Sequence, residues 1–401
     1  MKKLICIMLV FSMIFGLACG CSGNSDEPGS KTDSSSATEK SGEVKFLSTR
    51  KYQTGEGTPW SFDNTYYKLA HDKKLKIGYI GGSVTVGTGS ENGECWREYT
   101  TKWFRDNYPN AEVTTIDSGY GGTSSLWGLA RLQSMIIDLN PDLVFVEFSI
   151  NDLYNYISED QSAAIMEGII RKINAKLPNC DIVIISVVDN QTVVSQSLNA
   201  KMHSDIAKYY GISWLDMGVP MNEAMQKTGK KWADFASDSV HPNKEGYKIY
   251  GDYIENYLAG KLKESAGRNP GKLTAHKMPD LPFTDNSALK GETIWAKDIP
   301  ADSATWEYLE SQTAKYGKYS IRGKKGAELE LEFSGSFIAI FGDFNRAQMD
   351  CTLDGQCERK LGYKEELGEV MLYDNLDPNE KHTLKIKVNG SRARITAFLI
   401  G

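Results

Sequence analysis

The sequence predicts a three-layer α/β domain with a parallel five-stranded sheet, followed by a small all-β domain of the jelly-roll or β-sandwich type. Two observations carry this prediction. Between residues 75 and 260, apolar β-branched runs alternate with segments of helical character, which is typical of a parallel sheet covered by helices on both faces. From residue 291 onward, apolar residues recur with period two in short runs separated by glycine and asparagine turns, which is typical of an antiparallel sandwich.

In the α/β part, five strands and five helices are expected in alternation. The strands are expected at residues 75–80, 112–117, 142–149, 181–188 and 212–217. The helices are expected near residues 94–107, 125–139, 160–177, 195–210 and 243–259. Right-handed crossovers would bring the carboxyl ends of all five strands to one edge, where such sheets form their sites.

In the second domain, residues 291–401, six short strands are expected at 327–333, 337–344, 347–353, 369–376, 382–388 and 392–400. Residues 263–290 are rich in proline, glycine and polar residues and are predicted to be a linker or a wrapping loop. The α/β domain is therefore expected to span residues 45–262.

The N-terminus has the features of an export signal. Lys2 and Lys3 precede an apolar run, and small residues with two cysteines follow in "GLACGCSG". We expect residues 1–21 to be a signal peptide, with a lipobox-like end that makes Cys19 or Cys21 the lipidated residue. A simple secretory signal is the alternative. Residues 22–44 hold almost nothing to bury, so we expect a disordered tether and a protein on the outer cell surface.

Composition and cysteine spacing narrow the possible partners. The formal net charge is −6 and no long basic run occurs, which argues against nucleic acid. Beyond the signal, the four cysteines have no zinc-like spacing. Cys351 and Cys357 flank an Asp-Gly turn, so a disulfide and two reduced thiols are both open.

The stretch Tyr79–Gly87, "YIGGSVTVG", places a tight glycine-serine turn after the first strand. A phosphate-binding loop is disfavoured, because no Gly-Lys-Ser/Thr follows and the glycine spacing does not fit G-x-G-x-x-G. The G-x-S-x-G nucleophile elbow fails at Thr85. Ser83 is left as either a nucleophile of another type or a residue of a plain turn.

A serine nucleophile needs a base, and His241 is the best placed of five histidines. It follows Asp238 by three residues in "SDSVHPNKEGY", after the last strand and at the same sheet edge as Ser83. An aspartate and a histidine in one tight turn can hydrogen-bond, which fixes the imidazole tautomer. The other histidines are expected before the first strand (His71), inside a helix and at the surface (His203), in the linker (His276) and in the second domain (His382).

Oxyanion donors are expected in two further loops at this edge. Gly122, in the loop after the second strand, can offer a backbone N–H, and Asn151, after the third, can offer its amide. Taken one by one, each of these residues also fits a turn or a helix cap.

Together, the four blocks resemble those of the SGNH (GDSL-like) hydrolases over residues 72–260. The blocks are Gly82-Ser83, with Gly82 where the family often has Asp; the loop "DSGYGGT"; Ser149-Ile-Asn151-Asp152; and Asp238-Ser-Val-His241. The resemblance implies a flavodoxin-like SGNH hydrolase fold without a required metal or cofactor. It also implies Ser83 as nucleophile, His241 as base, Asp238 as its orienting group, and an oxyanion hole from Ser83, Gly122 and Asn151.

The second domain resembles the jelly-roll carbohydrate-binding modules that often accompany SGNH esterases, in strand pattern and in segments such as "FSGSFIAIFGD" and "EKHTLKIKVNG". No binding motif transfers. Exposed aromatic side chains stack on sugar rings in such modules, so four residues are candidates for either stacking or core packing: Trp295, Trp306, Tyr308 and Phe344.

The expected function is that of an exported esterase that removes acetyl groups from a polysaccharide, as acetylxylan esterases do. Trp96 and Trp127, near the ends of strands one and two, are expected to form an acyl pocket or a sugar platform, or to be core residues. The substrate polysaccharide is the expected partner, with the membrane reached only through the lipid anchor. The alternatives are a lipid esterase or thioesterase of the same fold, and a non-catalytic surface protein that binds glycans.

Overall fold

The computed structural model describes residue 44 and residues 51–91, 93–284, 291–310, 316–363, 368–391 and 393–401. The predicted signal with Cys19 and Cys21, the predicted tether before residue 44, and residues 285–290 of the predicted linker lie outside these ranges. No helix among the described residues has the length and apolar character needed to cross a membrane.

The predicted parallel sheet is confirmed. Its strands are β1 (Lys74–Gly81), β2 (Glu112–Gly119), β3 (Leu143–Glu147), β4 (Asp181–Ser186) and β5 (Ser213–Asp216), all parallel and in the order β2-β1-β3-β4-β5. The order reverses between β1 and β3, and in open α/β sheets this switch point is where ligands bind. The sheet topology therefore places the site next to the end of β1.

The five predicted helices are present with shifted ends, and shorter helices occur between them. The helical elements are α1 (Asp63–Tyr67), η1 (Lys68–Asp72), α2 (Ser83–Val86), α3 (Trp96–Asn107), α4 (Ser125–Met135), η2 (Ile137–Leu139), α5 (Ser149–Tyr154), α6 (Glu159–Lys176), α7 (Leu198–Tyr210), α8 (Gly218–Thr228), α9 (Trp232–Phe235) and α10 (Lys244–Arg268). Helix α10 starts where the side chain of Asn243 accepts the N–H of Gly246. It continues to Arg268, into the segment predicted as linker.

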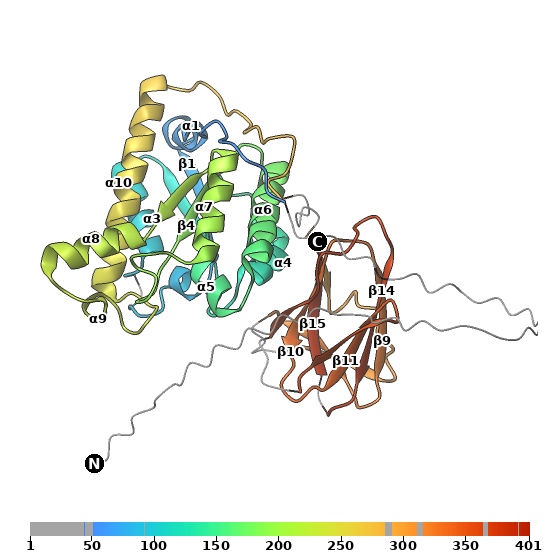
Figure 1. Cartoon of the computed structure of the whole chain (residues 1–401). Helices are drawn as coiled ribbons and strands as arrows, with labels where there is room; N and C mark the ends of the chain where they lie inside the picture. The colour runs from blue at the N-terminus through green and yellow to red at the C-terminus, as the bar shows by residue number, and fades with distance from the viewer. Residues whose placement is uncertain are drawn as a thin grey trace, which may run out of the picture. The chain divides into compact units, whose positions relative to one another are not determined.

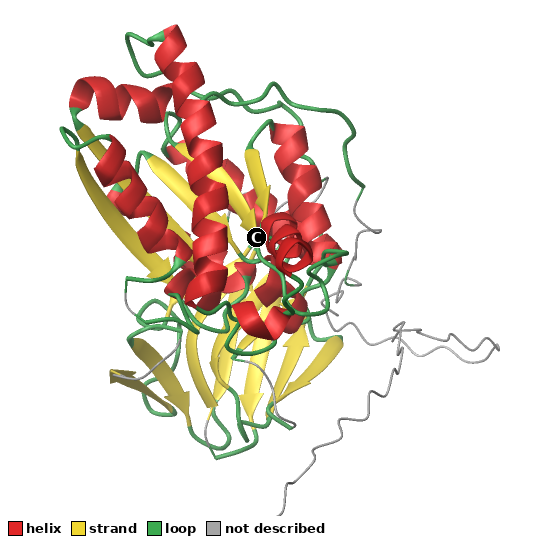
Figure 2. Cartoon of the chain, turned by 90° about the vertical axis from the view of Figure 1, so that its left-hand side faces the viewer, coloured by secondary structure: helices red, strands yellow, loops and turns green. Residues whose placement is uncertain are grey.

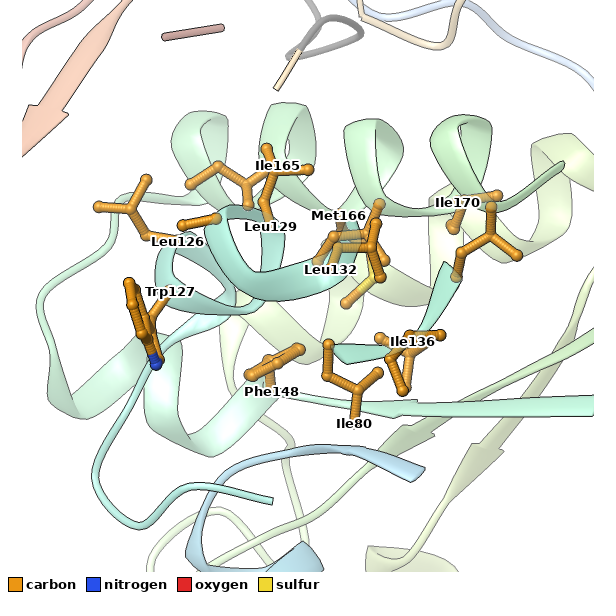
Figure 3. Packing of buried hydrophobic residues seen from close by; sticks show 14 of the residues in the cluster. Ile80, Leu126, Trp127, Leu129, Leu132, Ile136, Phe148, Ile165, Met166 and Ile170 are labelled. Carbon is orange, nitrogen blue, oxygen red and sulfur yellow. The ribbon is translucent and has the colours of Figure 1, made fainter. Parts of the chain in front are cut away.

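The sheet carries helices on both faces (Figures 1 and 2). Alternate residues of β1 point to opposite sides, so Tyr79 joins a core with α3 and α10, whereas Ile80 joins a core with α4, α6 and α7. Figure 3 shows the second core from close by, with apolar side chains of α4 lying beside those of α6. The sheet is therefore enclosed between two apolar cores.

The C-terminal domain consists of two antiparallel sheets. One has the order β13-β10-β15-β8-β7, with β6 also paired to β15, and the other has the order β12-β11-β14-β9. Their bounds are β6 (Glu292–Trp295), β7 (Trp306–Glu310), β8 (Tyr319–Gly323), β9 (Glu328–Phe333), β10 (Ile338–Asp343), β11 (Met349–Leu353), β12 (Cys357–Leu361), β13 (Glu369–Tyr373), β14 (His382–Val388) and β15 (Ala393–Ile400). The six predicted strands are present; β6, β7, β8 and β12 are additional.

Strand β10 is buried on both faces, unlike β9, and one of its faces contacts the α/β domain. In β9 buried and exposed residues alternate, whereas the first five residues of β10 are all buried. One face of β10 carries Ile338 and Ile340 into the sandwich core. Its other face carries Ala339 and Phe341 into the cluster that holds Trp127 of α4. The β domain therefore packs directly against the α/β domain.

Residues that follow α10 contact the α/β domain. The Asn64 side chain donates to the Thr274 carbonyl at 2.8 Å, and His276 Nε2 lies 2.6 Å from Asp181 Oδ1. The His276 ring also stacks on Trp60 with centroids 3.9 Å apart.

In the β domain, the register of β11 and β12 places Cys357 opposite Leu353 and not opposite Cys351.

Candidate active site

Ser83 lies at the point where β1 turns into α2. Gly82 is the N-cap of α2 and Ser83 is its first residue, so the Ser83 N–H belongs to the first helical turn, where N–H groups lack intrahelical acceptors. A Cβ on Gly82 would lie 1.9 Å from Oδ1 of Asn151. This contact gives a physical reason for glycine at the position where the resembling family often has aspartate.

His241 is hydrogen-bonded to both Ser83 and Asp238. Its Nε2 lies 2.7 Å from Ser83 Oγ, and its Nδ1 lies 2.7 Å from Asp238 Oδ2. A proton on Nδ1 satisfies the carboxylate and leaves Nε2 as the acceptor for the serine hydroxyl. The structure thus brings together the three side chains that the sequence predicts as nucleophile, base and orienting group.

The loop that carries Asp238 holds its carboxylate in the charged form. Oδ1 of Asp238 accepts the N–H groups of Val240 and His241, each at 2.8 Å. Burial by itself raises the pKa of Asp238, but these N–H groups and the His241 ring more than offset that effect, so its pKa is lowered from the ordinary value. An ionised Asp238 can stabilise a positive charge on the imidazole.

This loop is closed by one internal hydrogen bond and anchored by two hydrogen bonds from other segments. Within it, Ser237 N–H donates to the His241 carbonyl at 2.9 Å. Trp232 Nε1 donates to the Asp238 carbonyl at 2.7 Å. From the loop after β4, Asn190 N–H donates to the Ser239 carbonyl at 2.9 Å. The loop that carries the histidine is therefore held by one side-chain and one backbone hydrogen bond from two other segments.

The two loops that carry the predicted oxyanion donors lie beside the nucleophile turn. Asn151 is buried at the start of α5, and its amide lies against Gly82, as the projected Cβ contact shows. In the loop after β2, a Cβ on Gly121 would lie 3.8 Å from the Cβ of Ser83. Gly122 has φ +66°, a left-handed conformation that favours glycine. Both loops thus reach the serine from neighbouring strands.

Glu147, which is not among the residues predicted from the sequence, supports the nucleophile turn. It is the last residue of β3 and is fully buried. Its Oε2 accepts Thr85 Oγ1–H at 2.8 Å and Gly82 N–H at 3.3 Å. Burial raises the pKa of Glu147 to about 7. The available signal was a single acid inside the apolar run "DLVFVEFS".

Arg131 of α4, also not predicted from the sequence, joins the ends of β1 and β2. Its Nη2 donates to the carbonyls of Gly81 at 3.0 Å and Ser118 at 2.8 Å, and its guanidinium lies over the Tyr120 ring at 4.9 Å. The side chain is fully buried, and burial lowers the pKa of Arg131 to about 10. Arg131 therefore fixes the two strand ends that lead to the serine and to the Gly121-Gly122 turn.

Asp152 directs its carboxylate away from its neighbour Asn151 and into the scaffold. It accepts the N–H of Ser125 at 2.7 Å and the hydroxyl of Ser162 at 2.7 Å. The Ser162 hydroxyl also lies 2.9 Å from Nε2 of His203. His203 is fully buried in this network, so its predicted surface position is wrong.

The predicted substrate-binding role of Trp96 and Trp127 is wrong, because both side chains are buried, with exposed fractions of 1% and 0%. Trp96 Nε1 donates to the Val84 carbonyl at 3.1 Å and so stabilises α2, the helix that begins at Ser83. Trp127 meets the ring of Phe341 from the β domain at 4.9 Å between centroids. Both indoles are core residues, and neither presents a surface to a sugar.

Of the four aromatic candidates in the β domain, Tyr308 is the exposed one. Trp306 and Phe344 are buried in the sandwich core, and Trp295 is half-buried against Trp127. Tyr308 is 50% exposed and stacks on Tyr319 with centroids 5.5 Å apart. Across the described ranges, no group of three or more His, Cys, Asp or Glu side chains is arranged to hold a metal ion.

The comparisons with known proteins agree with this geometry. Residues 79–249 match the GDSL-like lipase/acylhydrolase family. We call the part of the chain that resembles this family the GDSL-like domain. The match includes all four blocks that resemble SGNH hydrolases, and it makes the protein a carboxylic ester hydrolase. No curated protein matches the sequence.

Two solved structures share the fold of the GDSL-like domain together with the β domain. One is a two-domain esterase, CEX, active on acetylated mannans and co-crystallised with mannopentaose; the TM-score is 0.68 at 20% identity, covering 86% of this chain and 97% of that one. The other is the same esterase without the oligosaccharide, with a TM-score of 0.65 at 19% identity and the same coverage. At this identity the likeness shows the fold.

Proposed function

We propose that the protein is an exported serine esterase that removes acetyl or other short acyl groups from a polysaccharide. The observation that carries the proposal is the continuous hydrogen-bond chain from Asp238 through His241 to Ser83, at 2.7 Å for each link. A serine hydroxyl is a weak nucleophile unless an adjacent base removes its proton, and this chain supplies the base in its required tautomer.

In the acylation step, His241 Nε2 takes the hydroxyl proton as Ser83 Oγ attacks the ester carbonyl carbon. The carbonyl oxygen becomes an oxyanion, which the N–H groups of Ser83 and Gly122 and the Asn151 amide stabilise. When the tetrahedral intermediate collapses, the bond to the sugar oxygen breaks and the imidazolium gives its proton to that oxygen. The sugar leaves as an alcohol and the acyl group stays on Ser83.

Deacylation repeats these roles with water as the nucleophile. His241 takes a proton from water, the resulting hydroxide equivalent attacks the acyl-serine carbonyl, and the imidazolium returns the proton to Ser83 Oγ as the carboxylic acid departs. Asp238, ionised and held by two backbone N–H groups, stabilises the imidazolium in both steps. No metal ion enters the scheme.

Two observations support a polysaccharide ester as the substrate. The fold likeness to the acetylmannan esterase extends over both domains and not over the GDSL-like domain alone. In addition, a hollow of about 680 Å³ runs along β2 up to Tyr120. Its lining combines hydroxyl groups, the Asp117 carboxylate and the Tyr120 ring with Lys76 and three apolar side chains, those of Ile116, Met135 and Leu139. Groups of this kind bind sugars through hydrogen bonds and ring stacking.

Export is the part of the proposal that rests on the N-terminal sequence. A signal with a lipobox-like end, followed by a polar tether, would place the enzyme at the outer surface with Cys19 or Cys21 lipidated. Polymeric substrates are met outside the cell, which fits this location. Mass spectrometry of the N-terminus of protein purified from membranes would identify the modified cysteine, whereas an unmodified, freely secreted chain would contradict the anchor.

The deciding experiment is acetate release from acetylated mannan and acetylated xylan by the wild type and by Ser83→Ala. We expect release by the wild type and none by the variant, with glycan binding unaffected. A wild type that releases no acetate and does not react with a serine-directed phosphonate would overturn the proposal. A para-nitrophenyl ester series that peaks at long acyl chains would support a lipid esterase instead.

A further inference from the structure

A buried carboxylate of the β domain contacts the catalytic domain next to the predicted oxyanion loop. Glu369, the first residue of β13, is 4% exposed. One of its oxygens accepts Ser124 N–H at 2.9 Å, and the other accepts Ser124 Oγ–H at 3.0 Å. Both of these donors belong to Ser124, so the carboxylate fixes the backbone and the side chain of that residue at once.

Ser124 links this contact to the active site. It is the N-cap of α4, and its Oγ also accepts the Leu126 N–H at 3.2 Å. Only Thr123 separates it from Gly122, the predicted oxyanion donor, and the Thr123 hydroxyl donates back to the Tyr120 carbonyl at 2.8 Å. Because the segment from Tyr120 to Ser124 is short and closed by this hydrogen bond, fixing Ser124 fixes Gly122.

The charge of Glu369 is also matched to the catalytic domain. A carboxylate at the N-terminus of the 11-residue helix α4 meets the positive end of the helix dipole. Farther along the same helix, the buried Arg131 interacts electrostatically with Glu369. This interaction raises the pKa of Arg131, whereas burial lowers it. Arg131 holds the ends of β1 and β2 and Glu369 holds Ser124, so each of the two charges contacts one end of the segment from Ser118 to Ser124.

The surrounding contacts restrict the movement of this carboxylate relative to the loop. Trp127, three residues after Ser124, is enclosed by the β-domain rings of Phe341 at 4.9 Å and Tyr316 at 5.4 Å between centroids. An apolar contact of this kind suffices to join two domains. Burying a carboxylate at such a contact costs free energy unless its oxygens accept hydrogen bonds. At Glu369, Ser124 donates two such hydrogen bonds, and Ser124 lies beside the loop that holds Gly122.

We propose that Glu369 is a positioning residue for the esterase reaction, through which the β domain holds the Gly122 N–H in line with the developing oxyanion. The inference rests on the proposed function, because it takes Gly122 as an oxyanion donor. The β domain is then part of the catalytic apparatus of the full chain, in addition to any role in substrate binding. A misplacement of about 1 Å in such a donor can cost about 100-fold in rate.

The test is Glu369→Gln in the full chain, assayed on para-nitrophenyl acetate. The amide keeps the size of the side chain, but it replaces one of the two acceptor oxygens by an NH₂ group and removes the negative charge, so Ser124 N–H and Oγ–H no longer each face a carboxylate oxygen. We expect kcat per phosphonate-titrated serine to fall about 10- to 100-fold with KM within about twofold. Affinity for a boronic acid, whose adduct with Ser83 carries the oxyanion charge, should fall by a similar factor.

Glu332→Gln is the matched control, since Glu332 is an exposed glutamate of the same domain paired with Lys381 at 2.7 Å. It should retain wild-type kcat. Titration of the reactive serine counts only folded sites, so partial unfolding of the variant does not imitate the effect. Ser124→Ala removes one of the two bonds; it should give a smaller loss, and the loss in the double variant should be less than additive.

Wild-type kcat per titrated site in Glu369→Gln, or a loss confined to KM, would overturn the inference and leave the esterase proposal standing. A wild type with neither acetyl esterase activity nor phosphonate reactivity would instead overturn the proposed function itself. If Glu369→Gln yields no folded protein, the same comparison is made with Ser124→Ala, where unchanged kcat and boronic acid affinity would contradict the inference.

Discussion

At the scale of single residues, Gly82 shows how one contact decides which side chain precedes the nucleophile. The resembling family often has aspartate there, yet a Cβ on Gly82 would lie 1.9 Å from Asn151 Oδ1 and 2.5 Å from its Cγ. We therefore expect Gly82→Asp to displace the Asn151 amide. Because losing one oxyanion donor costs about 10²- to 10³-fold in kcat, this substitution should lower kcat by at least about 100-fold.

Steady-state kinetics on a small acetyl ester would measure this loss. Gly260→Asp, in α10, is the matched control, since a Cβ projected from Gly260 meets nothing within 4 Å apart from its chain neighbours and the backbone of its own helix. Wild-type kcat in Gly82→Asp would show that the Asn151 amide moves aside without cost, and would contradict this account of Gly82.

Glu147 makes stability depend on pH. Burial raises its pKa from 4.5 to about 7, so between these pH values the folded state binds more protons than the unfolded state. The stabilisation is fully present below pH 4.5 and is lost as pH rises through about 7, a difference of about 3 kcal/mol. In Glu147→Gln, Oε1 can accept the same bonds from Thr85 and Gly82, but the titration is gone.

Urea unfolding at pH 5 and pH 8 tests this expectation. The wild type should lose more stability between these pH values than Glu147→Gln does. Equal pH dependence in the two proteins would show that Glu147 is ionised throughout, with its charge compensated in the folded state.

The residues of the site divide into those that sequence predicts and those that it does not. Ser83, Asn151 and His241 could be predicted because each follows a recognisable strand and the strands of a parallel sheet end at one edge. Arg131 and Glu369 could not, because a charged residue looks the same in a sequence whether it is solvated or buried. Their roles depend on partners 50 and 245 positions away in the chain.

At the scale of elements, strands with a strong apolar pattern were predicted and short charged strands were not. Strand β3 reads "LVFVE" and is buried throughout, whereas β12 reads "CERKL" and β7 reads "WEYLE". The charged strands are held by pairing with β11 and β8, and such tertiary pairing overrides weak local preference. The near-continuous apolar run of β10 was a usable signal for a sheet covered on both faces.

The hairpin of β7 and β8 is where we expect a sugar contact in the β domain. Tyr308 and Tyr319 stack there, with 50% and 39% of their surfaces exposed. Tyr308→Ala should raise the Kd for the substrate polysaccharide about two- to tenfold through lost ring stacking, with kcat on para-nitrophenyl acetate unchanged. Affinity electrophoresis in acetylated mannan measures the first effect.

The control for the hairpin is Tyr363→Ala, which removes an exposed tyrosine of the same domain that is bonded to Asp350 at 3.0 Å. It should leave the Kd unchanged. Equal weakening by Tyr308→Ala and Tyr363→Ala, or none by either, would contradict a specific platform at Tyr308.

At the scale of the whole molecule, one hydrophobic cluster runs from the GDSL-like domain into the β domain. It contains Trp127 and Leu129 of α4 together with Phe341 and Leu399 of the six-stranded sheet. Because each domain buries apolar surface of the other, unfolding either one exposes the partner to water at a cost of about 25 cal/mol per Å². The two domains should therefore unfold in one cooperative transition.

Phe341→Ala tests this coupling. Removing a fully buried phenyl ring should lower the free energy of unfolding by about 3–5 kcal/mol. The ring lies at the domain contact, so its loss should also separate the single transition into two, seen by tryptophan fluorescence and by loss of esterase activity at different urea concentrations.

Leu384→Ala is the control, because it removes a core residue of the sandwich outside that cluster. It should lower the free energy of unfolding by about 2–5 kcal/mol while the two probes stay coincident. Two separate transitions already in the wild type would show that the shared cluster does not couple the domains.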